Sequence, residues 1–369
     1  MRWLALLLLT ACSTVRATSP HQLETASGRV EVGSIEGAPY RIDVPARWNG
    51  QLFLYCHGYG GPPRAFDPRA DNELAQLLTS EGIAVAQSEY ARGGYAVVEG
   101  TRDTERLRAY FGTRFGSPSR TWVGGHSLGG SITMMLLETE PRRYDGGLAM
   151  CAPLGPATAY IKRLIFDPVV LFAAWFPDTL PSPVDVPADY TMSEQRAAAI
   201  AALLDGNEEA SVALRELTTA RTNLEMGRLL DEYVYILGEL RQRWGANAFD
   251  NRDTVYTGLH LDPAVNDRVR RYEAAPHALR ELSKAYTPTA RLERPLLALR
   301  TVYDPLISAF DAERYTQLAQ RAGTTHLFAQ KYVLGEGHCA IRGPELLSAL
   351  RELTQWRERG ARPTPGRLR

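Results

Sequence analysis

The sequence predicts an α/β fold: a mostly parallel central sheet flanked by helices, with a helical lid insertion. Short apolar runs alternate with longer amphipathic segments early in the chain and again near its end, as in β-α-β units. One apolar run ends in a glycine-flanked serine, Gly125-His126-Ser127-Leu128-Gly129, and a helix-like segment follows it. The alternation stops over residues 156–289, where helical patterns and proline-rich joints predict an inserted domain.

Composition sets the broad class. The chain has 369 residues, which suits one large α/β domain with an insertion. The chain has 42 Lys plus Arg and 42 Asp plus Glu, so its formal net charge is zero. It therefore lacks the excess of basic residues that is typical of nucleic-acid-binding proteins. Beyond the first twelve residues, the cysteines are Cys56, Cys151 and Cys339, whose spacing fits no zinc pattern. We expect no metal and no organic cofactor.

The N-terminal sequence is typical of an export signal. Arg2 precedes the apolar run Trp3–Leu9, which is too short to span a bilayer, so residues 1–11 are predicted to be a signal peptide. Leu9-Thr10-Ala11-Cys12 resembles the lipobox of bacterial lipoproteins, which implies lipidation of Cys12 and a lipid-anchored place in the bacterial cell envelope, facing the periplasm or on the outer membrane. The alternative is ordinary cleavage nearby, with Cys12 incidental. Residues 12–27 are then a flexible tether.

The first part of the predicted core covers residues 28–155. A hairpin is expected over residues 28–45, and a buried strand over 51–56 runs into His57-Gly58-Tyr59-Gly60. Further along, apolar and amphipathic patterns alternate in the order expected of helices packed on a sheet. These segments are a helix at 71–80, a strand at 83–87, a helix at 97–115, a strand at 118–123, a helix at 131–140 and a strand at 144–151.

The lid insertion, residues 156–289, is predicted to be helical. Its segment 161–176 is strongly apolar, and it either packs against the lid and core or faces substrate or membrane. Amphipathic helices are expected over 193–205 and 208–243. The core resumes over residues 290–358, and residues 359–369 are predicted to be a flexible tail. The resumed core contains a strand at 294–301, a helix at 308–322, a strand at 326–334 and a helix at 344–357.

The serine turn has a chemical meaning. A serine on a sharp strand-to-helix turn projects its Oγ into solvent, and glycines two residues away on each side leave room for it. The following helix directs free N–H groups toward the place where an oxyanion would form. Because a serine hydroxyl is a weak nucleophile, a histidine must accept its proton, and an acid must orient that histidine.

These motifs together resemble the α/β-hydrolase superfamily. The resemblance rests on Gly125–Gly129, His57–Gly60, Asp304-Pro305 and Gly337-His338, and it covers residues from about 28 to 155 and 290 to 358. In that superfamily the order along the chain is serine, acid, histidine, which implies a triad of Ser127, Asp304 and His338. Glu336 and Asp311 are the competing acids. The resemblance also implies an oxyanion hole formed by the amides of Tyr59 and Leu128.

Gly337-His338-Cys339 further resembles the feruloyl esterase and tannase group, in which a disulfide joins the cysteine after the histidine to one before the serine. Here His126, not cysteine, precedes Ser127. A disulfide from Cys339 to Cys151, or alternatively to Cys56, is the corresponding hypothesis, since both end strands that neighbour the strand before Ser127.

The function expected is hydrolysis of carboxylic esters, small or polymeric, through an acyl-enzyme on Ser127. Two alternatives keep the same residues: a serine peptidase resembling the prolyl oligopeptidase type, and an acyltransferase. A fourth hypothesis is a lipid-anchored binding protein without catalysis. No nucleic-acid partner is expected.

Overall fold

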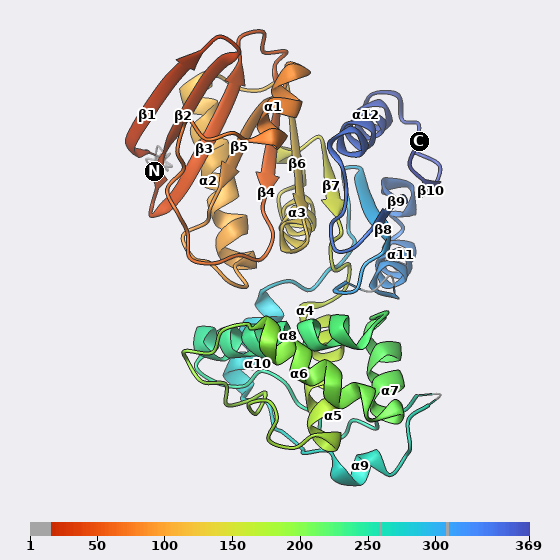
Figure 1. Cartoon of the computed structure of the whole chain (residues 1–369). Coiled ribbons are helices and arrows are strands. Elements are labelled where there is room, and N and C mark those ends of the chain that lie inside the picture. Colours follow the sequence, from red (N-terminus) through yellow and green to blue (C-terminus); the bar gives the residue numbers. More distant parts are fainter. Residues whose placement is uncertain (1–15, 259, 308–309) are drawn as a thin grey trace, which may run out of the picture.

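The computed structural model describes residues 16–258, 260–307 and 310–369, and in this part of the chain ten strands form one sheet (Figure 1). The strand order is β1-β2-β3-β5-β4-β6-β7-β8-β9-β10. The strands are β1 (Thr18–Thr25), β2 (Gly28–Ile35), β3 (Ala38–Pro45), β4 (Gln51–Cys56), β5 (Ala84–Ser88), β6 (Arg120–His126), β7 (Gly146–Met150), β8 (Leu296–Tyr303), β9 (Phe328–Glu336) and β10 (Gly366–Arg367).

The sheet changes character along its width. Strands β1, β2, β3 and β5 pair antiparallel, whereas every pairing from β5 through β4, β6, β7, β8 and β9 to β10 is parallel. The parallel strands are nearly continuous apolar runs because helices cover both of their faces. The structure therefore has the mostly parallel α/β sheet that the sequence predicts.

Helices form the two outer layers of the core. Helices α2 and α3 pack in the same hydrophobic cluster on one face, and α1 and α12 pack in a second cluster on the other face. The helices of the core are α1 (Glu73–Ser80), α2 (Val97–Phe115), α3 (Leu128–Thr139), α11 (Phe310–Ala322) and α12 (Gly343–Arg359), with 3₁₀ turns at Pro141–Arg143 and Thr325–Leu327.

The insertion that the sequence predicts as a lid, and that keeps the name lid insertion below, lies between β7 and β8 and covers the end of the sheet toward which the arrowheads of β4 and β7 point (Figure 1). A π-helical turn, Lys162–Phe166, joins its first two helices. Its helices are α4 (Ala157–Ile161), α5 (Asp167–Trp175), α6 (Glu194–Asp205), α7 (Glu208–Thr218), α8 (Asn223–Trp244), α9 (Val265–Arg268) and α10 (Pro276–Lys284). The predicted 208–243 helix is two helices, because Thr219 adopts a left-handed conformation and Thr222 caps a new helix.

The apolar segment 161–176 is mostly internal. Phe166, Val169, Val170 and Phe172 are buried in the hydrophobic cluster. Among the described residues, no helix is long and apolar enough to cross a membrane.

Both ends of the described chain differ from the sequence prediction. Residues 18–25, predicted as tether, form β1, which pairs antiparallel with β2. Residues 366–367, predicted as flexible tail, form β10 beside β9, and Leu368 is buried. Both segments are ordered by pairing with an existing strand, which supplies their backbone hydrogen bonds. The local sequence alone does not predict this pairing. The predicted signal peptide and Cys12 lie outside the described residues.

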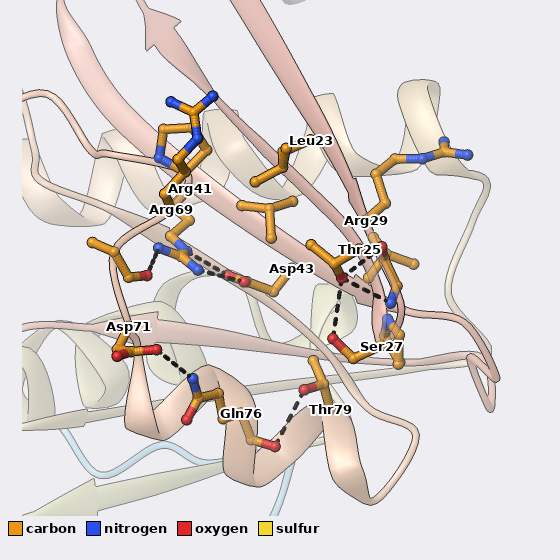
Figure 2. A pocket seen from close by; sticks show the side chains of 16 residues that line it. Leu23, Thr25, Ser27, Arg29, Arg41, Asp43, Arg69, Asp71, Gln76 and Thr79 are labelled. Carbon is orange, nitrogen blue, oxygen red and sulfur yellow. Dashed lines mark hydrogen bonds and ion pairs between the residues drawn. The ribbon is translucent and has the colours of Figure 1, made fainter.

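A surface hollow of about 370 Å³ lies beside the antiparallel strands (Figure 2). At one wall, the buried Arg41 guanidinium pairs with Asp43 at 2.9 Å and donates a hydrogen bond to the carbonyl of Ala70 at 2.8 Å. Both charged groups, the guanidinium of Arg41 and the carboxylate of Asp43, therefore have partners, and a structural role accounts for them. None of the residues that line this surface hollow borders the pocket at Ser127 described below.

Candidate active site

Ser127 sits on the sharp turn between β6 and α3. Its backbone has φ 55° and ψ −120°, a strained conformation for a residue with a side chain. A Cβ at Gly125 would lie 2.3 Å from the carbonyl oxygen of Cys56, and one at Gly129 would lie 2.0 Å from the same atom. Glycine at both positions therefore lets β4 and the turn approach each other, and the Ser127 amide is held by the Met150 carbonyl at 2.8 Å.

Two backbone amides beside Ser127 are available to an anion. Leu128 opens α3, and Tyr59 lies in the loop after β4. That loop runs against the serine, because a Cβ on Gly58 would lie 3.4 Å from the Cβ of Ser127. Within the described part of the chain, neither amide donates a hydrogen bond to another protein group. The sequence-predicted oxyanion residues thus come together with Ser127 around one pocket.

His57 and Tyr90 pack together at the start of this loop. The two rings stack with centroids 4.0 Å apart, and the Tyr90 hydroxyl donates a hydrogen bond to the His57 carbonyl at 3.1 Å. Tyr90 is fully buried. These contacts fix the start of the loop that carries Tyr59.

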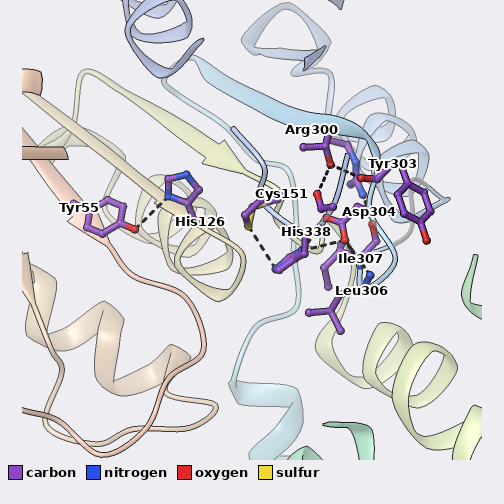
Figure 3. Close-up of a disulfide and its surroundings, with 12 residues drawn as sticks. Tyr55, His126, Cys151, Arg300, Tyr303, Asp304, Leu306, Ile307 and His338 are labelled. Carbon is purple, nitrogen blue, oxygen red and sulfur yellow. Dashed lines mark hydrogen bonds and ion pairs between the residues drawn. A yellow bond between two sulfur atoms is a disulfide. The ribbon is translucent and has the colours of Figure 1, made fainter. Parts of the chain in front are cut away.

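Asp304 and His338 form a close pair (Figure 3). Asp304 follows β8, His338 follows β9, and Nδ1 of the histidine lies 2.8 Å from Oδ2 of the aspartate. The other carboxylate oxygen accepts the amides of Leu306 and Ile307 at 3.0 and 2.9 Å. The buried carboxylate is thereby held in one orientation and holds the imidazole in turn.

The competing acids are placed differently. Glu336 points to the lid insertion and pairs with Arg221 at 2.8 Å. The side chain of Asp311 lies outside the described residues. Asp304 is thus the carboxylate that the structure brings to His338.

His338 and Ser127 are not hydrogen-bonded in this structure, as judged among the described residues. Nε2 of His338 instead lies 3.5 Å from Sγ of Cys339. A proton transfer from Ser127 to His338 would need one of these two side chains to move first. Loose triad contacts that tighten only with bound substrate are common in unliganded enzymes.

The disulfide joins Cys151, at the end of β7, to Cys339, directly after His338 (Figure 3). It is the first of the two pairings considered from the sequence, and Cys56 is a buried free thiol. Three possible ligand atoms gather here, from Cys151, His338 and Cys339. Two of them are disulfide sulfurs, which lack the thiolate form that binds metals, so this cluster is not a metal site.

His126, next to the nucleophile, is a poor candidate for the base. Its Nδ1 lies 3.3 Å from the Tyr55 hydroxyl, and the two rings meet edge to face. Burial lowers the pKa of His126 to about 4, with a smaller contribution from the positive charge of His338. The side chain is therefore neutral at pH 7 and packs against Tyr55.

A small pocket opens beside Ser127 beneath the lid insertion. Its accessible volume is about 60 Å³, and apolar side chains from α4, the π-helical turn and α8 supply much of its lining. Among the described lining residues, Glu232 of α8 is the only charged one. Sequence reasoning missed Glu232; the available signal was a carboxylate on the same helix face as the buried Leu229 and Ile236, which is weak.

No protein-family model matches the sequence, and no curated protein matches it in sequence. Solved structures do match. Candida antarctica lipase A in its closed state aligns with 95% of this chain and 84% of its own, at 13% identity and a TM-score of 0.53. Feruloyl esterase B from Aspergillus oryzae aligns with 95% of this chain and 88% of its own, at 13% identity and a TM-score of 0.49. Acylaminoacyl peptidase from Pyrococcus horikoshii aligns with 94% of this chain and 42% of its own, at 9% identity and a TM-score of 0.43.

The likeness to lipase A agrees with the strand order, the serine turn between β6 and α3, and the insertion between β7 and β8. This chain has the α/β-hydrolase fold.

Proposed function

We propose that this protein is a serine hydrolase that cleaves carboxylic esters. The observation that carries the proposal is the arrangement around Ser127. The serine stands on a strained turn beside two unbonded amides, and a buried carboxylate holds His338 in the loops at the same end of the sheet. A protein that only binds a ligand has no need of all these features together.

In the proposed reaction, Ser127 Oγ attacks the ester carbonyl carbon while Nε2 of His338 takes the hydroxyl proton. The amides of Tyr59 and Leu128 bind the oxyanion, each with an effect of about 3 kcal/mol on the transition state. The C–O bond to the alcohol breaks as His338 returns the proton to it. Water, deprotonated by His338, then attacks the acyl-enzyme. The C–O bond to Ser127 breaks as His338 returns the proton to Oγ, and the acid is released. Asp304 orients the imidazole throughout.

The pocket supports short acyl groups as substrates. An accessible volume of about 60 Å³ leaves little room beside Ser127 under the lid insertion. We therefore expect acetate and butyrate esters to be preferred over palmitate esters.

The test is hydrolysis of a p-nitrophenyl ester series, acetate to palmitate, by the full chain and by Ser127→Ala. We expect turnover that falls with chain length and a loss in the variant on the order of a million-fold. A peptide p-nitroanilide and an added alcohol acceptor run beside the series. Cleavage of the anilide alone would favour the peptidase, and predominant transfer to the alcohol would favour the acyltransferase.

We also propose export with lipid attachment at Cys12, supported by the apolar run and the Leu9–Cys12 motif. Expression in a bacterium fed a labelled fatty acid tests it. Label in the full chain that disappears in Cys12→Ser is the expected result, and an unlabelled chain contradicts it.

A further inference from the structure

Two polar groups in the Ser127 pocket have no protein partner. Among the described residues, the carboxylate of Glu232 accepts no hydrogen bond and forms no ion pair. The hydroxyl of Tyr59 lines the same pocket, is buried, and likewise has no hydrogen-bond partner. By contrast, the neighbouring hydroxyls of Tyr95 and Tyr160 lie 2.6 Å apart and satisfy each other.

Leaving a buried polar group unpaired is costly. The Tyr59 hydroxyl, buried without a partner, loses its hydration and gains nothing in return. By comparison, the buried carboxylate of Asp231, the residue preceding Glu232, accepts bonds from Tyr190 and the Ser193 amide. The buried Tyr59 hydroxyl therefore calls for a partner at this site, and the partly buried, unpaired carboxylate of Glu232 lines the same pocket.

The electrostatics agree with this geometry. Burial raises the pKa of Glu232, and the charge of His338 only partly offsets that effect. Burial also raises the pKa of Tyr59, and the carboxylates of Glu239 and Glu232 raise it further, so its hydroxyl stays protonated. The pocket thus offers one acceptor and one hydroxyl within an otherwise mostly apolar lining.

We propose that Glu232 and the Tyr59 hydroxyl form a polar subsite for a hydrogen-bond donor, an ammonium or a hydroxyl group, carried by the acyl part of the ester. We assign the subsite to the acyl part because the amide of the same Tyr59 is proposed above to bind the ester carbonyl oxygen, which belongs to the acyl part. This inference rests on the ester hydrolysis proposed above. It narrows the substrate class to short amino- or hydroxy-acyl esters.

The test uses two sets of ethyl esters of matched shape. In one, the second acyl carbon carries a methyl, hydroxyl or ammonium group: 2-methylpropanoate, lactate and alaninate. In the other, the third carbon does: 3-methylbutanoate, 3-hydroxybutanoate and 3-aminobutanoate. Acid release by the full chain at pH 7 gives kcat/KM, which is divided by each ester's rate of alkaline hydrolysis to remove intrinsic reactivity.

We expect at least one donor-bearing ester to exceed its methyl partner by about tenfold or more, because a site built for a donor rejects the analogue that lacks it. Glu232→Leu should reduce that ratio below about threefold. Tyr59→Phe, which removes only the hydroxyl, should lower it as well. Glu194→Gln, at an exposed lid carboxylate, is the matched control and should keep the wild-type ratio.

The outcomes separate the two proposals. If the wild type cleaves the methyl esters as well as the donor esters in both sets, ester hydrolysis stands and the subsite is wrong. If Glu232→Leu lowers all rates equally and keeps the ratio, Glu232 acts on His338 or on folding, and the subsite is again wrong. If no ester is cleaved and a fluorophosphonate leaves Ser127 unlabelled, the proposed function itself fails.

Discussion

The conformation of the serine turn depends on single residues. Gly129 is the tightest point, because its missing Cβ leaves room for the carbonyl of Cys56. Gly129→Ala should therefore destabilise the fold by about 3 kcal/mol or more, since backbone, not a flexible side chain, must move. Denaturant unfolding measures the change.

The control for this substitution is Gly112→Ala in α2, where an added Cβ meets nothing within 4 Å. In a helix that change should stabilise by about 0.5–1 kcal/mol. Equal effects of the two substitutions would contradict the close approach of β4 to the turn.

His126 should make stability depend on pH. The folded pKa is about 4 and the usual value is 6.5, so above pH 6.5 the side chain is neutral in both states and contributes nothing to the dependence. Between pH 6.5 and 4 only the unfolded chain binds the proton, and the free energy of unfolding falls, by up to about 3 kcal/mol. Unfolding midpoints across this range measure it.

His126→Phe keeps a ring against Tyr55 and removes the titration. The variant should lose less stability than the wild type between pH 6.5 and 4. Parallel curves for the two proteins would mean that His126 is protonated in the fold.

At the scale of elements, the disulfide ties the loop of His338 to the end of β7. It links residues 188 positions apart, for which the chain-entropy model gives about 5 kcal/mol of stabilisation. Replacing Cys151 and Cys339 together by serine should lower the unfolding midpoint. Ester turnover should also fall, on the order of tenfold to a hundredfold, because the imidazole is less precisely placed.

Reductant provides the control for the disulfide. It should bring the wild type to the midpoint of the double variant and leave the variant itself unchanged. A wild type insensitive to reductant, with a midpoint equal to that of the variant, would show that the bond does not contribute.

The sequence predicted the elements with strong periodicity. The 97–115 helix begins and ends as expected, and the 51–56 strand does too. Strands β1 and β10 were not predicted. Their residues carry little β-forming signal and are ordered by pairing with β2 and β9. Chain order and glycine spacing led to the prediction of Ser127, Asp304 and His338, of which the structure brings Asp304 and His338 into contact. Glu232 could not be found this way, because only the packing of the lid insertion on the core brings it to the serine.

At the scale of the whole molecule, the lid insertion is held to the core by Arg243 of α8. Its side chain is 5% exposed and pairs with Glu99 of α2 and Glu239, each at 2.8 Å. Arg243→Met would leave these carboxylates uncompensated at a cost of about 3–5 kcal/mol. We expect faster proteolysis within residues 156–289 and a lower unfolding midpoint.

Arg228→Met on the same helix is the matched control. Its pair with Glu194 is exposed on both sides, so the effect should stay within about 1 kcal/mol. Equal sensitivity of the two variants to protease would contradict an anchoring role for Arg243.

The central claim is that Ser127 is a nucleophile activated by His338. The most direct test is reaction of the full chain with a fluorophosphonate, followed by peptide mass spectrometry, with His338→Ala beside it. We predict a stoichiometric adduct on Ser127 that forms far more slowly in the variant. An unmodified Ser127, or an adduct formed equally fast without His338, would contradict the account.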